Sequence, residues 1–238
     1  MKATPLLRAS AVLAIGAGVA GGLYLALLNV PESNVLALCV SALLVLLIIA
    51  VAGFTLAAAA ALGQDFALPA TARRAVAALP GFVVALGIFA LLWWLTESAD
   101  ASWQAQRGEV DAVIMLYLGK TQTAWLHETV SGFLWLIRWA LGLSIVAGLV
   151  VTATGGGLRS APRGLRLSVR PLPLGAATVG LLFGVEGLWR LAYWRPSHLP
   201  PSWVESAFAA LKLGVLYLIA AAMVALVLRI YSSTAARG

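Results

Sequence analysis

Four ionisable residues fall within long apolar stretches of the chain, where a charge is costly. Glu186 and Arg190 are four residues apart, which places them on one face of a helix at the spacing of an ion pair. Arg138 and Lys212 lie in two further apolar stretches. At about 1.5 Å of rise per residue, all four lie roughly 8–14 Å from one end of their predicted helices. This pattern indicates either a structural Glu186–Arg190 pair or a polar site for a headgroup, a substrate or a partner helix.

Tryptophan accompanies these charges. Trp135 and Trp139 flank Arg138, and Trp189 precedes Arg190. All nine tryptophans fall near the helix ends that carry the charges, whereas an interfacial belt normally uses both membrane surfaces. An aromatic layer on one side is typical of a cavity for a lipid or other amphiphile, or of a surface buried against another membrane subunit.

Catalytic motifs are scarce. His127 and Glu128 are adjacent and invite an acid–base interpretation, but the only other histidine, His198, lies in a different predicted loop. The sequence contains no HExxH, no Gly-x-Ser-x-Gly, no phosphate-binding glycine loop and no acidic metal motif. Cys39 is the only cysteine, which excludes an intramolecular disulfide or a paired-cysteine zinc site. No metal site is therefore predicted, and the residues identify no cofactor.

Composition decides which elements carry these residues. Of the 238 residues, 62% are hydrophobic and 11% are charged, and the mean hydropathy is +0.96. A soluble domain is about a quarter charged, and a core of this size cannot hide so much apolar surface. The chain is therefore predicted to lie in a lipid bilayer.

Six apolar runs are long enough to cross about 30 Å of hydrocarbon as helices. We predict an all-α, polytopic transmembrane bundle that forms a single domain over residues 1–238. Between the third and fourth spans, Val110, Val113, Ile114 and Tyr117 recur at helical spacing and predict a short amphipathic helix against the outer face of the bundle. The predicted spans are 9–28, 35–62, 75–96, 132–153, 172–193 and 204–231.

Basic residues alternate with the spans and predict the orientation of the chain. Nine of them fall in the termini and in the loops after the second and fourth spans, whereas only Arg107, Lys120 and Arg195 fall in the other loops. Since Lys and Arg are retained on the cytoplasmic side, we expect both termini to be cytoplasmic in a bacterial inner membrane. The formal charge of +7 then reflects topology, and nucleic acid is not an expected partner. The nine are Lys2, Arg8, Arg73, Arg74, Arg159, Arg163, Arg166, Arg170 and Arg237.

Three classes of function remain open. The favoured class is an integral subunit or scaffold of a membrane complex, with membrane proteins as partners. The second class is a transporter component or a protein that binds a lipid or another amphiphilic ligand. The third class is a small membrane enzyme that acts at the outer interface, for which Glu186, His127 and Glu128 are the first candidates.

Overall fold

The computed structural model describes residues 3–31, 34–64, 68–119, 123–194 and 203–237. These residues are almost entirely helical and contain no strand. Six helical stretches among them are long and apolar enough to cross a membrane, which confirms the predicted all-α fold with six potential spans. The stretches are Thr4–Leu28, Val35–Gly63, Pro69–Ala105, Ala124–Ser168, Pro171–Tyr193 and Trp203–Ala236.

Two of the six stretches contain several consecutive elements. The fourth is built from α5, η1, α6, η2 and α7, and the fifth from α8, η3 and α9. Both η1 and η3 are π-helical, whereas η2 is a short 3-10 turn. The bounds are α1 Ala3–Leu28, α2 Val35–Gly63, α3 Leu68–Ala105, α4 Arg107–Leu118, α5 Ala124–Leu136, η1 Ile137–Leu141, α6 Gly142–Gly156, η2 Gly157–Ser160, α7 Ala161–Ser168, α8 Pro171–Leu182, η3 Phe183–Leu188, α9 Trp189–Tyr193 and α10 Trp203–Ala236.

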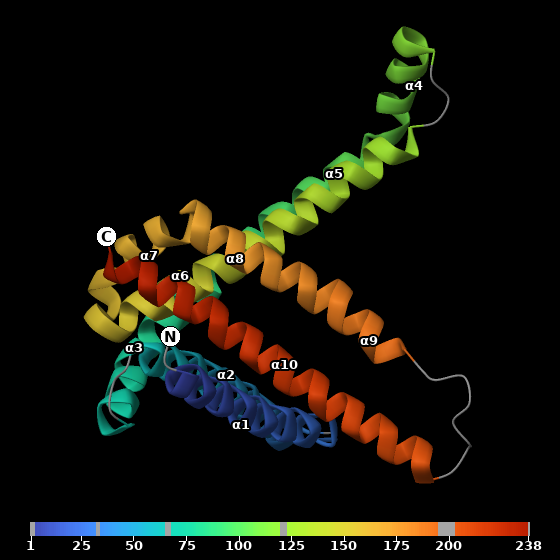
Figure 1. The fold of residues 1–238 in the computed structure, drawn as a ribbon. Coiled ribbons are helices and arrows are strands. Elements are labelled where there is room, and N and C mark those ends of the chain that lie inside the picture. Colours follow the sequence, from blue (N-terminus) through green and yellow to red (C-terminus); the bar gives the residue numbers. More distant parts are fainter. Residues whose placement is uncertain (1–2, 32–33, 65–67, 120–122, 195–202, 238) are drawn as a thin grey trace.

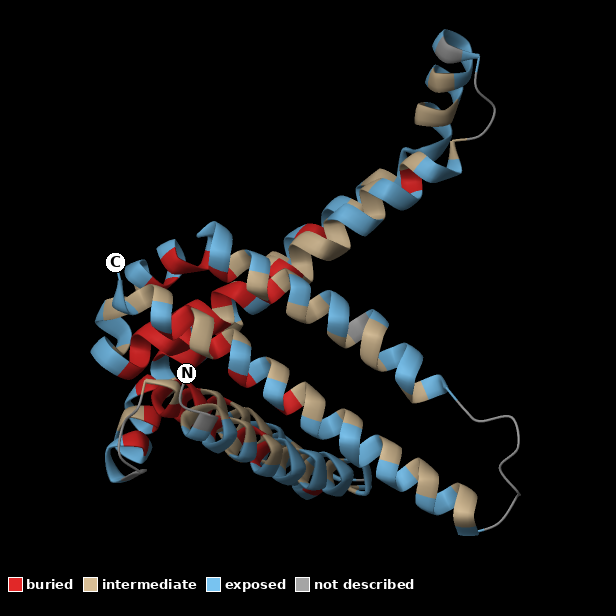
Figure 2. Cartoon of the chain, in the orientation of Figure 1, coloured by how far each residue is buried: buried red, intermediate tan, exposed pale blue. Residues whose placement is uncertain are grey.

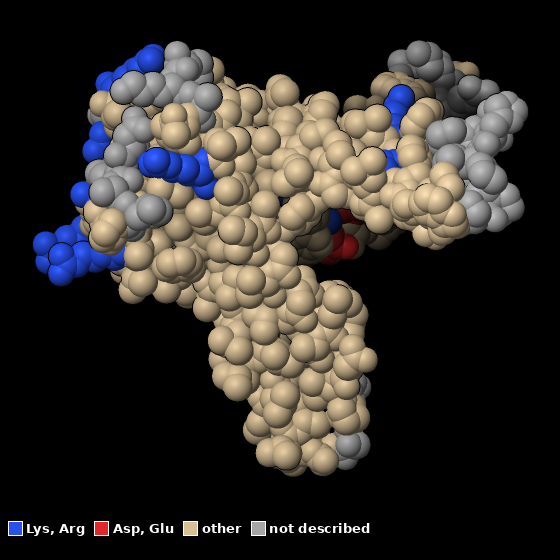
Figure 3. All heavy atoms as spheres, turned by 60° about the horizontal axis from the view of Figure 1, so that its bottom comes forward, with Lys and Arg blue, Asp and Glu red and all other residues tan. Residues whose placement is uncertain are grey.

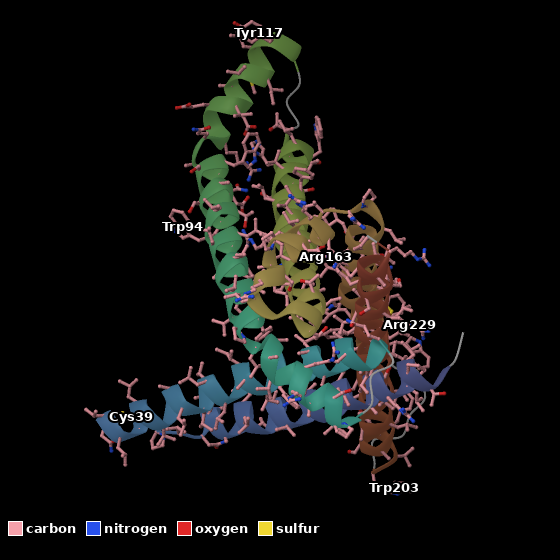
Figure 4. The ribbon with its side chains drawn as sticks, turned by 90° about the vertical axis from the view of Figure 1, so that its left-hand side faces the viewer. Cys39, Trp94, Tyr117, Arg163, Trp203 and Arg229 are labelled. Atoms are coloured by element: carbon pink, nitrogen blue, oxygen red, sulfur yellow. The ribbon has the colours of Figure 1, made fainter. Side chains whose placement is uncertain are left out.

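The helices meet at one end and diverge at the other (Figure 1). In Figure 1 the α3–α5 pair points to one side, whereas the α1–α2 pair, α8–α9 and α10 run toward the other. The α1 helix stays close enough to α10 for the Tyr217 hydroxyl to donate to the Ala14 carbonyl oxygen. In Figure 4, Cys39, Tyr117 and Trp203 lie near three separate tips. We call the shared region the compact end; it comprises the C-terminal ends of α2, α6 and α10, the start of α3, and α7.

The hydrophobic core lies at the compact end, where the buried residues gather (Figure 2). Many of its residues are small, including the run Ala57–Ala61, which lets the helix backbones approach closely. Gly148 of α6 and Gly164 of α7 pack together so tightly that a Cβ on Gly164 would lie 3.0 Å from the Gly148 carbonyl oxygen. Close backbone packing therefore fixes α7 on α6.

A polar cluster holds the same region together. The Ser144 hydroxyl donates to the Ser168 carbonyl oxygen at 2.6 Å, and the Ser168 hydroxyl is 3.0 Å from the Ser144 carbonyl oxygen. Tyr231 of α10 is fully buried, and its hydroxyl is hydrogen-bonded to that of Ser144. Because an unpaired polar group is expensive inside a membrane protein, this cluster ties α6, α7 and α10 into one arrangement.

The helix α4 lies at the far tip of the α3–α5 pair (Figure 1). Two of its four predicted apolar side chains are exposed, Val113 by 54% and Tyr117 by 78%, whereas Val110 and Ile114 are partly buried. The expected packing of this helix against the outer face of the bundle stays a prediction. The predicted spacing did locate a helix here, but α3 and α5 carry it away from the remaining helices.

Candidate functional site

Two of the charges within the spans lie on π-helical turns. Arg138 belongs to η1 and Glu186 belongs to η3. A π turn holds one extra residue, is rare, and is frequently found at functional sites. Two glycines, Gly184 and Gly187, accompany Glu186 in η3 and weaken the local preference for regular α-helix. Both charges therefore lie where the helix of their span is irregular.

Arg138 lies in a nearly closed cage between α3 and α5. Its Nη1 is 2.8 Å from Glu97 Oε2, and its Nε donates to Thr96 Oγ1 at 2.9 Å. The guanidinium carbon lies 4.9 Å from the ring centre of Trp93, which itself meets Trp139 edge-on at 5.2 Å. The Arg138 side chain is only 12% exposed, so its charge is neutralised, hydrogen-bonded and stacked within one helix pair.

Glu186 and Arg190 form the ion pair that their spacing predicts. Both Nε and Nη2 of Arg190 lie 3.1 Å from Glu186 Oε2. Unlike Arg138, these two side chains are 64% and 81% exposed, and the adjoining Trp189 is 62% exposed. Trp189 contacts only Tyr193 among aromatic rings of the described residues, at 4.6 Å. The pair therefore lies on an open face of the span.

Lys212 binds backbone carbonyl groups and no acidic side chain among the described residues. Its Nζ donates to the carbonyl oxygens of Ala192 and Trp194 at 2.6 and 3.0 Å and lies 5.7 Å from the Phe208 ring. The last carbonyls of a helix lack partners within the helix and attract a cation. Lys212 thus caps the end of α9 from α10 and is not directed at Glu186.

The structure therefore does not gather the four charges into one layer. Arg138, Trp139 and the partly buried Trp135 belong to the α3–α5 pair, whereas Glu186 and Arg190 lie on η3 and α9. Equal depth along separate helices does not bring side chains together when the helices diverge.

No family model, curated protein or solved structure matches this chain.

His127 lies at the tip of the α3–α5 pair, in a second polar site. It is buried, with 2% of its surface exposed, and its Nε2 is 2.7 Å from Asp111 Oδ1. Trp103 lies beside it at 5.3 Å, and neither Trp103 Nε1 nor His127 Nδ1 has a hydrogen-bond partner in the described part of the chain. Glu128 is exposed and takes no part in this contact, so the side chain that meets His127 is Asp111.

The Asp111 carboxylate is stabilised by its hydrogen bonds. The bonds to Thr123 and then to His127 hold the pKa of Asp111 below its usual value. Among the described residues, no hydroxyl or thiol is hydrogen-bonded to His127 itself, and no three His, Cys, Asp or Glu side chains gather as a metal site. The pair joins α4 to α5 and gives no evidence of catalysis.

Sequence reasoning missed two partners for clear reasons. Glu97 was expected in a loop after a span ending at residue 96, but α3 continues to Ala105 and places Glu97 one turn beyond Trp93, beside Arg138. Asp111 lies 16 residues before His127 on a different helix, and only the fold shows that His127 reaches it. The i,i+4 spacing of Trp93 and Glu97 places both on one face of α3, but only the fold brings Arg138 to that face.

Proposed function

We propose that this protein is an integral subunit or scaffold of a membrane complex, and that a partner transmembrane helix covers the Glu186–Arg190 face of η3 and α9. The observation that carries the proposal is the exposure of this ion pair within an apolar span. Arg138, in contrast, is almost completely covered by side chains of this same chain.

Energetics favour a covered pair. One charged residue at the centre of a membrane helix costs about 2.5–3.5 kcal/mol on insertion scales, and such residues normally face protein or water. Pairing Glu186 with Arg190 offsets part of this cost, but both side chains remain more than half exposed. A second helix with a polar or aromatic face would remove them from lipid and bury Trp189 at the same time.

The orientation belongs to the same proposal. Both described chain ends and α7 lie at the compact end, which also carries most of the Lys and Arg side chains in Figure 3. By the positive-inside rule, this end faces the cytoplasm of a bacterial inner membrane, and α4 faces outward. The partner interface then lies in the outer half of the membrane.

A photoreactive residue at Val179 tests the interface, because this position is 66% exposed and lies two helical turns before Glu186. In native membranes we expect one discrete protein adduct that weakens when Glu186→Gln is added. Leu46 of α2, 63% exposed, is the matched control and is expected to label lipid. Lipid adducts alone at both positions, or an adduct indifferent to Glu186→Gln, would contradict the proposal.

One observation favours a second candidate, the binding of an amphiphile. A cavity of about 360 Å³ lies between α6, α8 and α10, and apolar side chains such as Leu143, Leu181 and Met223 line it almost completely. Its size and lining suit an acyl chain. A photoreactive residue at Leu181 tests this function: it should label a lipid that is retained through purification in mild detergent. If removal of the lipid left the stability of the protein unchanged, that result would count against this function.

A further inference from the structure

A polar cavity of about 710 Å³ opens at the compact end, far along α10 from the Glu186–Arg190 face. The C-terminal ends of α2, α6 and α10 form its walls, and the start of α7 closes one side. Its polar lining includes Gln64, Ser160, Arg163, Arg229, Ser232 and Ser233. Figure 4 shows Arg163 and Arg229 near the junction of the helices, on two different elements.

The two arginines differ in how far they are engaged. Arg163 donates through Nη2 to the Ala235 carbonyl oxygen at 2.8 Å, which leaves its other donors available. Arg229 is partly buried and has no hydrogen-bond or ion-pair partner among the residues that the structure describes. The serine hydroxyls already donate to carbonyls of their own helices, so the guanidinium groups are the main free donors.

The surroundings of the cavity are strongly cationic. A second cavity of about 410 Å³ contains Arg159, Arg166 and Arg170 and shares Arg163 and Ala235 with the first. No described Asp or Glu lines either cavity. In the sequence, Asp65 is the only acidic residue of the two basic loops, and it lies outside the described residues.

We propose that this cavity binds a phosphate group, either of an anionic lipid headgroup or of a soluble phosphorylated anion. A guanidinium group matches phosphate oxygens in a two-point, charge-assisted contact, and Arg163 and Arg229 approach the cavity from two helices. Basic cavities between transmembrane helices on the cytoplasmic side are suited to lipid phosphates. This site is independent of the proposed partner interface, because it lies at the opposite end of the spans.

Binding to the purified full-length protein in a neutral detergent tests the inference. Native mass spectrometry compares phosphatidylglycerol with phosphatidylcholine, and thermal unfolding measures stabilisation by inorganic phosphate. We expect phosphatidylglycerol, inorganic phosphate or both to bind to the wild type. In Arg229→Gln, the affinity for the anion that binds should fall about tenfold. Lipid binding assigns the site to a headgroup, and binding of inorganic phosphate alone assigns it to a soluble anion.

Two further variants make the result decisive. Arg73→Gln removes the same charge from the compact end at an exposed position that lines neither cavity, and it is expected to bind as the wild type does. Gly155→Met fills the cavity without changing charge, and a Cβ at Gly155 meets no atom within 4 Å. Equal losses in Arg73→Gln and Arg229→Gln, or full binding by Gly155→Met, would overturn the proposal.

Discussion

Gly148 of α6 has no room for a side chain, because it packs directly against α7. In Gly148→Ala the new Cβ would lie 2.3 Å from Ser168 Oγ and 2.7 Å from the Gly164 carbonyl oxygen. The serine side chain can rotate, but the carbonyl belongs to the backbone of α7. Normal separation of a carbon from a carbonyl oxygen requires about 0.6 Å of movement. The whole of α7 must therefore shift away from α6.

The expected loss follows from the groups that move. Overpacking costs about 1–3 kcal/mol, and the shift also strains the Ser144–Ser168 pair of hydrogen bonds, each worth about 0.6 kcal/mol between membrane helices. The higher helix propensity of Ala returns about 1 kcal/mol. We therefore expect a net loss of about 1–3 kcal/mol in the free energy of unfolding.

Thermal unfolding in a mild detergent measures this loss. For a chain of this size, each kcal/mol lowers Tm by about 2–4 °C, so Gly148→Ala should lower Tm by about 2–12 °C. Gly132→Ala of α5 is the matched control, because a Cβ there meets nothing within 4 Å and the variant should be neutral or slightly stabilised. Equal Tm values for the two variants would refute the close contact between α6 and α7.

Three further outcomes follow from the structure. Hydrogen bonds lower the pKa of Asp111 below 3.8, so their contribution is fully present above that pH and is lost as the pH falls through the lowered pKa. The protection of the α4 amides, measured relative to their intrinsic exchange rate at each pH, should then fall on acidification, and Asp111→Asn should abolish this dependence. Cys39→Ser should fold normally because Cys39 is exposed and unpaired, so it provides a background without cysteine. In this background, a cysteine introduced at Ser102 should react with a thiol reagent from outside the cell, and one at Ser160 should not. The reverse pattern would contradict the orientation. Glu97→Gln should destabilise the α3–α5 pair by about 1–3 kcal/mol because Arg138 loses its counter-ion, and an unchanged unfolding midpoint would contradict this.

The helices were predictable from sequence because their cause is local. Runs of about 20 apolar residues must satisfy their backbone hydrogen bonds within the segment, so length and composition are enough to locate a potential span. Each of the six predicted ranges lies inside a helical stretch of the structure. Helix ends were less predictable, as at α3, where polar residues such as Ser98 and Gln104 continue the helix to Ala105.

The arrangement of the helices was not predictable in the same way. Apolar side chains face lipid and protein equally well, so a hydrophobic pattern does not reveal which faces pack. The tight contact of Gly148 with Gly164 and the polar cluster around Tyr231 depend on residues far apart in the chain. The sequence did place Glu186 and Arg190 on one face, since that relation is local, but it did not reveal that the face is open.

The two π-helical segments connect packing with the proposed interface. They are the only π segments in the described part of the chain, and each contains a charge within a span, Arg138 in one and Glu186 in the other. An extra residue rotates the rest of the helix by about 100°, so the face that packs before a π turn need not be the face that packs after it. In the fifth stretch, Gly180 precedes the π segment η3 and lies close to α10. Glu186 and Arg190 come after the start of η3, and their side chains are exposed. In the inner half of this stretch the Gly180 face therefore packs against α10 and leaves Val179 exposed, and in the outer half the charged face is open to a partner.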